Sequence, residues 1–223
     1  PTRAFAKEII FGGTPSLSRQ GLGSIATLML NVAAGAFGDA AIAGMSIVTR
    51  ISFFTYAMVI GLGQGFQPLC GFCYGAKLYG RVKEAFFFCI KCGTVFLSVC
   101  AILGFIFSTS IISIFRDDAE VVAVGSAALR WQVLSFPLVA SIVLTNMLMQ
   151  TIRKPVRANI VAAARSGLFF IPLIFILPYF FGLLGVEMCQ MWADCCSFAV
   201  AVPIAWSAFR DMRREQMELG KSQ

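Results

Sequence analysis

The chain of 223 residues is too apolar for a soluble globular domain, since 58% of its residues are hydrophobic, 13% are charged and its mean hydropathy is +0.82. It contains no histidine, which excludes an imidazole proton relay and a zinc site of the Cys/His type. These features predict an all-α membrane protein.

Six apolar stretches are long enough to cross about 30 Å of hydrocarbon, which takes roughly 20 helical residues. The predicted spans are residues 9–37, 42–71, 82–115, 121–152, 158–181 and 186–209. We expect them to form one six-helix transmembrane bundle over residues 1–209, followed by a cytoplasmic tail over residues 210–223. Kinks are expected at the prolines inside these spans, which are Pro15, Pro68, Pro137, Pro172 and Pro203.

Basic residues gather in alternate loops, which predicts the orientation because Lys and Arg accumulate on the cytoplasmic side. The basic loops and ends contain Arg3, Lys7, Lys77, Arg81, Lys83, Arg153, Lys154, Arg157, Arg210, Arg213, Arg214 and Lys221. The opposite loops contain only Arg116 among them. We therefore expect a multi-pass protein of the cell inner (plasma) membrane, with both termini of this segment in the cytoplasm.

The net charge of +7 follows from this bias between loops. It does not indicate nucleic acid as a partner, and the basic tail is expected to touch the anionic headgroups of membrane lipids. The sequence begins at Pro1 without a methionine or a cleavable signal pattern. We therefore expect it to be the second part of a longer polypeptide.

Two C-x-x-C pairs, Cys70 with Cys73 and Cys89 with Cys92, have fifteen residues between them. This spacing is typical of a zinc site with four thiolate ligands. The flanks, however, are long apolar runs instead of the polar turns that surround a zinc knuckle. The simpler interpretation is that these cysteines are small apolar residues on membrane helices, so we expect no bound metal and no cofactor.

The stretch GLGQGFQPLCGFCYGAKLYGRVKEAF, from Gly61, contains a Gly-x-x-Gln-Gly-x-Gln-Pro run, then Gly-x-x-Tyr-Gly-Ala and Arg-Val-Lys. It resembles the carboxy-terminal half of the multidrug and toxic compound extrusion (MATE) transporters. Other segments resemble that half in the same order, so the resemblance covers nearly the whole chain. The first helix is matched by PSLSRQGLGSIATLMLN, the fourth by LSFPL, the fifth with its outer turn by RSGLFFIPLIFILPYFFGLLGV, and the sixth by ADCCSF. It places the first cysteine pair at the end of a helix and the second inside the membrane. One departure is Arg153, where many relatives have glycine.

The resemblance implies one lobe of a twelve-helix transporter whose partner is a missing amino-terminal six-helix lobe. It also implies a secondary-active multidrug exporter, which exchanges a cation (proton or sodium) for small organic, often cationic, compounds by alternating access. One branch of the family has carboxylates for the coupling cation in this half, but the middle of the first and fourth predicted spans has none. We therefore expect the coupling ion to bind mainly outside this chain.

Two alternatives are a flippase for lipid-linked precursors, whose cavity would be more cationic, and a non-transporting membrane scaffold subunit. Enzymatic activity is not expected. The sequence has no G-x-S-x-G elbow, no H-E-x-x-H and no phosphate-binding G-x-x-x-x-G-K-[ST], and we identify no catalytic residue.

Ionisable residues within a membrane suggest function because they are costly there. Asp194 is the first candidate, about eight residues or 12 Å from the outer end of its span. Its alternative role is a structural ion pair or hydrogen bond with another helix. Long cations such as Lys91 and Arg165 can instead extend to the headgroups. The further charged candidates are Arg19, Arg50, Arg130 and Arg165.

Polar and aromatic residues of the spans provide candidates for a substrate cavity, where a few polar groups orient a mostly apolar ligand. Joining one helix to another is the equally simple alternative. The cavity candidates are Asn31, Tyr56, Gln64, Gln67, Asn146, Gln150 and Asp194, with Gln132 as a further polar residue.

Overall fold

The computed structural model describes the backbone of residues 3–221 and the side chains of Leu17 and of residues 20–218. Within this part of the chain every regular element is helical. The elements in order are α1 (Arg3–Gly35), α2 (Asp39–Gly75), α3 (Tyr79–Ile106), α4 (Ser108–Phe115), α5 (Ala119–Thr151), α6 (Pro155–Ala163), the π-helical η1 (Ala164–Leu168), α7 (Phe170–Phe181) and α8 (Leu183–Lys221).

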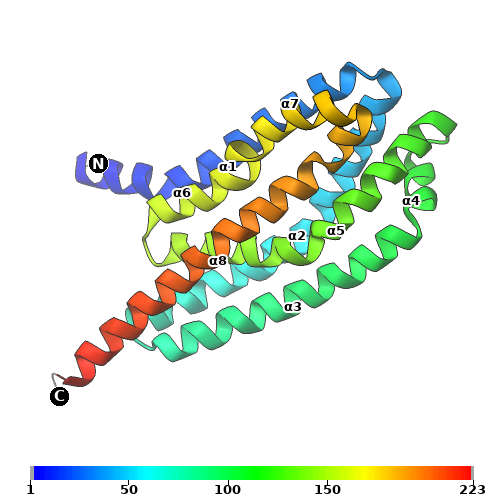
Figure 1. Ribbon diagram of the computed structural model, residues 1–223. Helices are drawn as coiled ribbons and strands as arrows, with labels where there is room; N and C mark the ends of the chain where they lie inside the picture. The colour runs from blue at the N-terminus through cyan, green and yellow to red at the C-terminus, as the bar shows by residue number, and fades with distance from the viewer. Residues whose placement is uncertain (1–2, 222–223) are drawn as a thin grey trace.

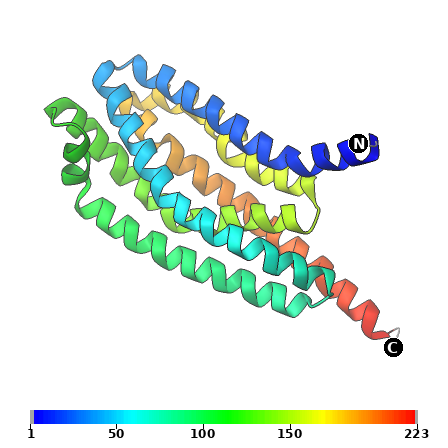
Figure 2. The ribbon, with the colours of Figure 1, turned by 180° about the vertical axis from the view of Figure 1, so that it is seen from behind.

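These helices coincide with the six predicted spans. Counting only described residues, five segments are long and apolar enough to cross a membrane: Asp39–Gly75, Tyr79–Ile106, Ala119–Thr151, Pro155–Phe181 and Leu183–Glu218. The first predicted span coincides with α1, which lies along α6 and α7 at one side of the bundle (Figures 1 and 2). The predicted all-α membrane bundle is confirmed, whereas the boundary between lobe and tail at residue 209 stays a prediction, because α8 continues through it.

Helix α5 forms the centre of the bundle. Apolar residues occur all round it, which is typical of a helix that other helices surround, and Leu129, Val133, Phe136, Ala140 and Leu144 are buried along its length. Figure 1 shows α3 on the opposite side of the bundle from α1, α6 and α7. This arrangement places α2, α5 and α8 between the two outer groups, where their polar side chains can meet.

Both termini lie at one end of the bundle, together with the turns from α2 to α3 and from α5 to α6 (Figures 1 and 2). The turns from α1 to α2 and from α7 to α8, and helix α4, lie at the other end. All four groups of basic residues therefore come to the same end, as the loop charges require. That this end faces the cytoplasm remains a prediction.

The two turns at the basic end have the same backbone structure. Lys77 and Arg153 have positive φ angles of 58° and 55°. Leu78 N donates to Cys73 O at 2.8 Å and Lys154 N donates to Met149 O at 2.9 Å, so each helix ends in a Schellman motif. A left-handed residue after a helix is most often glycine. Arg153 therefore adopts a backbone conformation that glycine would adopt at a lower steric cost.

Helices α2 and α5 cross closely where both have glycine. A Cβ atom at Gly44 would lie 3.1 Å from the backbone N of Gly125, and a Cβ atom at Gly125 would lie 3.0 Å from Cγ2 of Ile112. Small residues let helix backbones approach in a membrane, where packing and hydrogen bonds provide most of the attraction.

The helical segment from α6 to α7 is interrupted by η1. Phe169 N donates to Ala164 O at 3.2 Å, five residues back. Pro172, where a kink is predicted, lies in the first turn of α7 just after η1, and it has no N–H to donate to the carbonyl of Leu168, the last residue of η1. In contrast, α2, α5 and α8 run through Pro68, Pro137 and Pro203 as single helices.

The cysteine pairs lie on two helices instead of on turns. Cys70 and Cys73 are buried in the last turns of α2, Cys89 is buried in α3, and Cys92 is exposed on α3. Among the described side chains, no group of three or more His, Cys, Asp or Glu residues is arranged to hold a metal. The expectation that the chain binds no zinc stays a prediction, which elemental analysis of the purified protein can check.

Candidate functional site

Asp194 on α8 is the centre of a polar cluster inside the bundle. Its side chain has no exposed surface, and its Oδ1 accepts from Arg165 Nε at 2.8 Å and from Gln190 Nε2 at 3.1 Å. Its Oδ2 accepts from Ser135 Oγ at 2.9 Å. Three donors from α5, η1 and α8 therefore surround one carboxylate, as expected for an ion at membrane depth. The contact between Asp194 and Arg165 is the structural ion pair with another helix that the sequence predicts as the alternative role of Asp194.

Arg165 lies inside η1. The prediction that Arg165 extends to the lipid headgroups is wrong, because its guanidinium is bonded to Asp194 and its side chain is only 21% exposed. The π-helical turn places one more residue in this turn than an α-helix would, which changes the direction of the side chains that follow. Such turns frequently occur at functional sites.

Tyr56 of α2 extends the cluster. The Arg165 guanidinium carbon lies 4.7 Å from the centroid of the Tyr56 ring, a cation–π distance. Tyr56 Oη accepts from Gln132 Nε2 of α5 at 3.0 Å, and its ring contacts the Phe136 ring edge to face at 5.2 Å between centroids. The cluster thus joins α2, α5, η1 and α8 through one connected set of polar contacts.

A cavity of about 340 Å³ opens beside this cluster. It lies between α1, α2, α5, η1 and α8, and the polar residues among its lining are Gln20, Ser24, Thr27, Thr49, Ser52, Tyr56, Gln132, Arg165, Ser166 and Gln190. Its size is at the lower end of the roughly 300–1,000 Å³ of small-molecule sites. Ser52 Oγ is buried there and has no hydrogen-bond partner among the described residues. A bound ligand could accept or donate at this hydroxyl.

The electrostatic character of the cavity is close to neutral. Arg165 is the one cation among its described lining residues, and Asp194 neutralises it. A buried ion pair contributes little net stability, but removing one partner leaves an uncompensated charge. The pair therefore holds η1 against α8 and fixes the position of Arg165 beside the cavity.

Asn146 and Gln150, two of the predicted cavity residues, do not line this cavity. Asn146 Nδ2 donates to the Ala158 carbonyl of α6 at 2.7 Å, and Asn146 Oδ1 accepts from Gln150 Nε2 at 2.6 Å. The first contact joins α5 to α6 beside the turn between them, the second lies within α5, and neither residue lines the cavity. For Asn146 the structure shows the alternative role, a bond from helix to helix, whereas Gln150 bonds to Asn146 within α5.

The remaining uncharged candidates lie outside this cavity. Asn31 is half-buried on α1, Gln67 is half-buried on α2, and Gln64 is exposed on α2. None of the three lines the cavity described above. A role in a larger cavity shared with a second lobe stays a prediction for them.

The other basic candidates whose side chains the structure describes do not contact the cluster. Arg50 and Lys91 are exposed on α2 and α3. Arg130 is exposed on α5, where its Nε donates to Ser108 Oγ at 2.9 Å and its guanidinium carbon lies 5.9 Å from the Phe105 ring centroid. Arg19 falls in α1, but its side chain lies outside the described residues.

Sequence reasoning missed several members of the site, among them Ser52, Ser135 and Gln190. The spacing of Gln190 and Asp194 carried a usable signal, since residues four apart share a helix face. Ser135 and Ser52 gave no such signal, because their role depends on the packing of α5 and α2 against other helices.

Comparisons with known proteins agree with this fold. A family model described as MatE matches residues 15–176. The chain is 27% identical over 207 residues to the multidrug export protein MepA of Staphylococcus haemolyticus, covering 93% of this chain and 45% of that protein. MepA of Staphylococcus aureus is 28% identical over 207 residues, with 92% and 45% covered. The chain thus spans about half the length of the curated relatives it matches.

Solved structures show the same architecture. The Vibrio cholerae MATE transporter VcmN in its bent form has a TM-score of 0.87 at 18% identity, covering 95% of this chain and 48% of that one. A MATE transporter of the MOP superfamily in an outward-facing conformation has a TM-score of 0.89 at 20% identity, with 96% and 49% covered. A MOP superfamily transporter from Pyrococcus furiosus has a TM-score of 0.88 at 19% identity, with 96% and 48% covered. Since the family model covers most of the residues, the chain belongs to the MatE family.

Proposed function

We propose that this chain is the carboxy-terminal lobe of a secondary-active exporter that moves small organic compounds, often cations, in exchange for protons or sodium ions. Membership of the MatE family and relatives that are multidrug export proteins support this proposal. The observation that carries it is the position of the polar cavity. Asp194 lies eleven residues into α8, about 16 Å at 1.5 Å per residue, near half of the roughly 30 Å of hydrocarbon. Transporter sites are typically found at this depth.

The second lobe is part of the proposal. Because the chain spans about half the length of its relatives, an amino-terminal six-helix lobe would complete the transporter. The two lobes would enclose a common cavity that opens alternately to the two sides of the membrane. Ion and substrate must then bind the two states with different affinities, since only differential binding shifts an equilibrium.

The coupling ion is proposed to bind mainly in that other lobe. Both oxygens of Asp194 already accept hydrogen bonds, from Arg165, Gln190 and Ser135. No carboxylate belongs to the described residues that line the cavity. A proton or sodium ion bound at Asp194 would have to displace the Arg165 guanidinium, which would leave that cation unpaired in the membrane.

The charge of the cavity favours an exporter of organic compounds over a flippase for lipid-linked precursors. A flippase needs unpaired cations to hold a diphosphate, whereas the one described cation of this cavity is paired with Asp194. The aromatic side chains of Tyr56, Phe53 and Phe170 beside it suit flat apolar molecules. We likewise infer a transport role without catalysis by this chain.

The proposed location is the plasma membrane, with the basic end of the bundle in the cytoplasm. Cysteines introduced one at a time at Lys77 and Arg153, in a variant without the native cysteines, should be labelled from the cytoplasmic side of cells. Cysteines at Asp39 and Asp117 should be labelled from outside. The opposite pattern would invert the proposed orientation.

Gradient-driven efflux tests the function. The complete two-lobe protein, reconstituted in liposomes that contain a fluorescent organic cation, should transport it when a proton or sodium gradient is imposed, and should stop when the gradient is collapsed. The 223-residue chain alone should not transport, and co-expression with the amino-terminal lobe should restore efflux. Transport by this chain alone, or transport by the complete protein without any cation gradient, would refute the proposal.

A further inference from the structure

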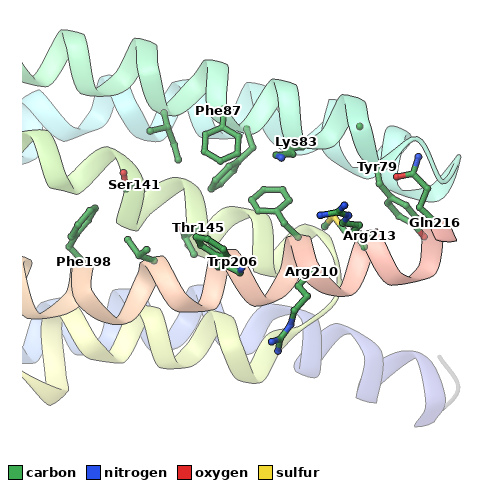
Figure 3. Close-up of a pocket in the computed structure, with 17 residues that line it drawn as sticks. Tyr79, Lys83, Phe87, Ser141, Thr145, Phe198, Trp206, Arg210, Arg213 and Gln216 are labelled. Carbon is green, nitrogen blue, oxygen red and sulfur yellow. The ribbon is translucent and has the colours of Figure 1, made fainter. Parts of the chain in front are cut away.

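A second and larger cavity lies between α3, α5 and α8, away from the site described above. It has a volume of about 830 Å³ and shares no lining residue with the cavity beside Asp194. Figure 3 shows it as a groove between α3 and α8, with α5 behind it. At this size it can hold a long molecule, since small-molecule sites range over roughly 300–1,000 Å³.

The middle of the groove is apolar and aromatic. Phe87 of α3 and Phe209 of α8 stack with 5.8 Å between ring centroids. Trp206 is 73% exposed at its edge, and Phe198 lies at its far end (Figure 3). Ser141 and Thr145 are the polar residues that α5 contributes. An occupant of this part would have to be mainly hydrocarbon.

One end of the groove is cationic. Lys83 of α3 and Arg213 of α8 lie at this end (Figure 3), and neither makes an ion pair with a described residue. Glu215 is near in sequence, but it accepts from Tyr79 Oη at 2.6 Å and pairs with neither cation. Arg210 also lines the groove, although its side chain extends along the other side of α8 in Figure 3.

The length of the groove matches one leaflet of a bilayer. Fifteen residues of α8 separate Phe198 from Arg213, which is about 22 Å along the helix. Half of a bilayer that is roughly 40–45 Å thick with its headgroups has the same length. Trp206 lies about halfway between Phe198 and Arg213 on α8, and tryptophan is enriched where the hydrocarbon of a membrane meets its headgroups. Basic pockets between membrane helices on the cytoplasmic side bind anionic lipid headgroups.

We propose that this groove binds one anionic phospholipid, with its acyl chain on Phe87, Phe209 and Phe198 and its phosphate between Lys83 and Arg213. An organic cation fits less well, because two unpaired cations at the groove end repel it. A soluble anion would leave the aromatic walls uncovered. The site would be a lipid contact of the cytoplasmic leaflet and would not depend on the transported compound.

Quenching of Trp206 by brominated lipid tests the proposal. The complete transporter is prepared with Trp206 as its one tryptophan and placed in phosphatidylcholine vesicles that contain increasing fractions of phosphatidylglycerol brominated on its acyl chains. Half-maximal quenching should need several-fold less brominated phosphatidylglycerol than brominated phosphatidylcholine. Lys83→Gln and Arg213→Gln should each lower this preference by up to about fivefold, because a cation near an anionic surface contributes about that factor.

Arg214→Gln is the matched control, since Arg214 is exposed beside Arg213 and does not line the groove. It should leave the preference within about twofold of the parent, and gel filtration checks that each variant is folded. Equal quenching by the two lipids, an equal effect of Arg214→Gln, or no quenching by either lipid because the second lobe covers the groove would each overturn the proposal.

Discussion

Helix α8 carries two ion-pair sites that differ mainly in burial. Asp194 has no exposed side-chain surface and its partner Arg165 is 21% exposed, with 2.8 Å between the charged atoms. Asp211, seventeen residues further on, is 28% exposed and contacts Lys154 at 2.6 Å and Arg157 at 3.1 Å, whose side chains are 30% and 36% exposed. Both sites tie α8 to the segment from α6 to η1.

The distances are similar, so the environment determines what each site contributes. Around Asp211, water screens the charges and can replace a lost partner, so such pairs are typically worth about 0–1 kcal/mol. Around Asp194, nothing replaces the partner, and breaking a buried pair costs about 3–5 kcal/mol. The loss of Asp211 should therefore cost little, whereas the loss of one partner of the central pair leaves a buried charge without compensation.

Asp194→Asn should give the largest loss of stability, about 3–5 kcal/mol, because Arg165 then remains buried without a counter-charge. Unfolding in detergent, followed by circular dichroism, measures it. The double variant Arg165→Met with Asp194→Leu provides the check, since it removes both charges. It should be more stable than Asp194→Asn alone, and a double variant that is less stable would show that charge burial is not the cause.

The crossing of α2 and α5 tests the effect of packing alone, because no charged group takes part in the contact between Gly44 and Gly125. Gly44→Val should destabilise by about 1–3 kcal/mol, because its Cβ would lie 3.1 Å from the backbone N of Gly125. Gly61→Ala on the same helix has no atom within 4 Å of the new Cβ and should be neutral or stabilising. Thermal unfolding of both in the same detergent measures the difference. Equal losses would mean that α2 and α5 do not approach as described.

Backbone strain at the basic end should give a smaller effect. Arg153→Gly should stabilise by about 0.5–1 kcal/mol, because φ at this residue is 55° and glycine adopts that conformation without a steric cost. Arg153→Ala removes the same charge but keeps the strain. Chemical unfolding of the two variants should therefore show a gain for glycine alone, and an equal gain for alanine would assign the effect to charge.

Asp211→Asn should give the smallest effect, no more than about 1 kcal/mol. It should shrink further in 0.5 M salt, since screening weakens exposed pairs, whereas the cost of Asp194→Asn should hardly change with salt. Unfolding in low and high salt compares the two directly. A loss at Asp211 as large as that at Asp194 would contradict the difference between the two regions.

The sequence predicts the fold well because hydrocarbon thickness and loop charge act on long stretches of chain. Span positions and the placement of all basic loops at one end depend on such local patterns. Asp194 could be identified for the same reason, as a carboxylate that cannot extend to water.

The contacts of the site could not be predicted in the same way. The position of Arg165 depends on one π-helical turn. If residues 158–181 formed a regular α-helix, as the sequence predicts, that side chain would point in another direction. Asn146 and Gln150 are polar, as cavity residues often are, but Asn146 bonds to Ala158 across the turn from α5 to α6 and Gln150 bonds to Asn146. Ser135 donates to Asp194, which lies 59 residues away in sequence, and no local sequence pattern predicts such a contact.

The central claim is that the Asp194 cluster organises the transport cavity as well as the fold. Gradient-driven efflux of an organic cation by the complete transporter in liposomes, divided by the amount of folded protein, tests it in Asp194→Asn and Asp211→Asn. We predict that Asp194→Asn lowers efflux per folded transporter at least about tenfold and that Asp211→Asn stays within twofold of the parent. If Asp194→Asn lowers the folded amount but leaves efflux per folded transporter unchanged, the cluster is structural and the claim is wrong.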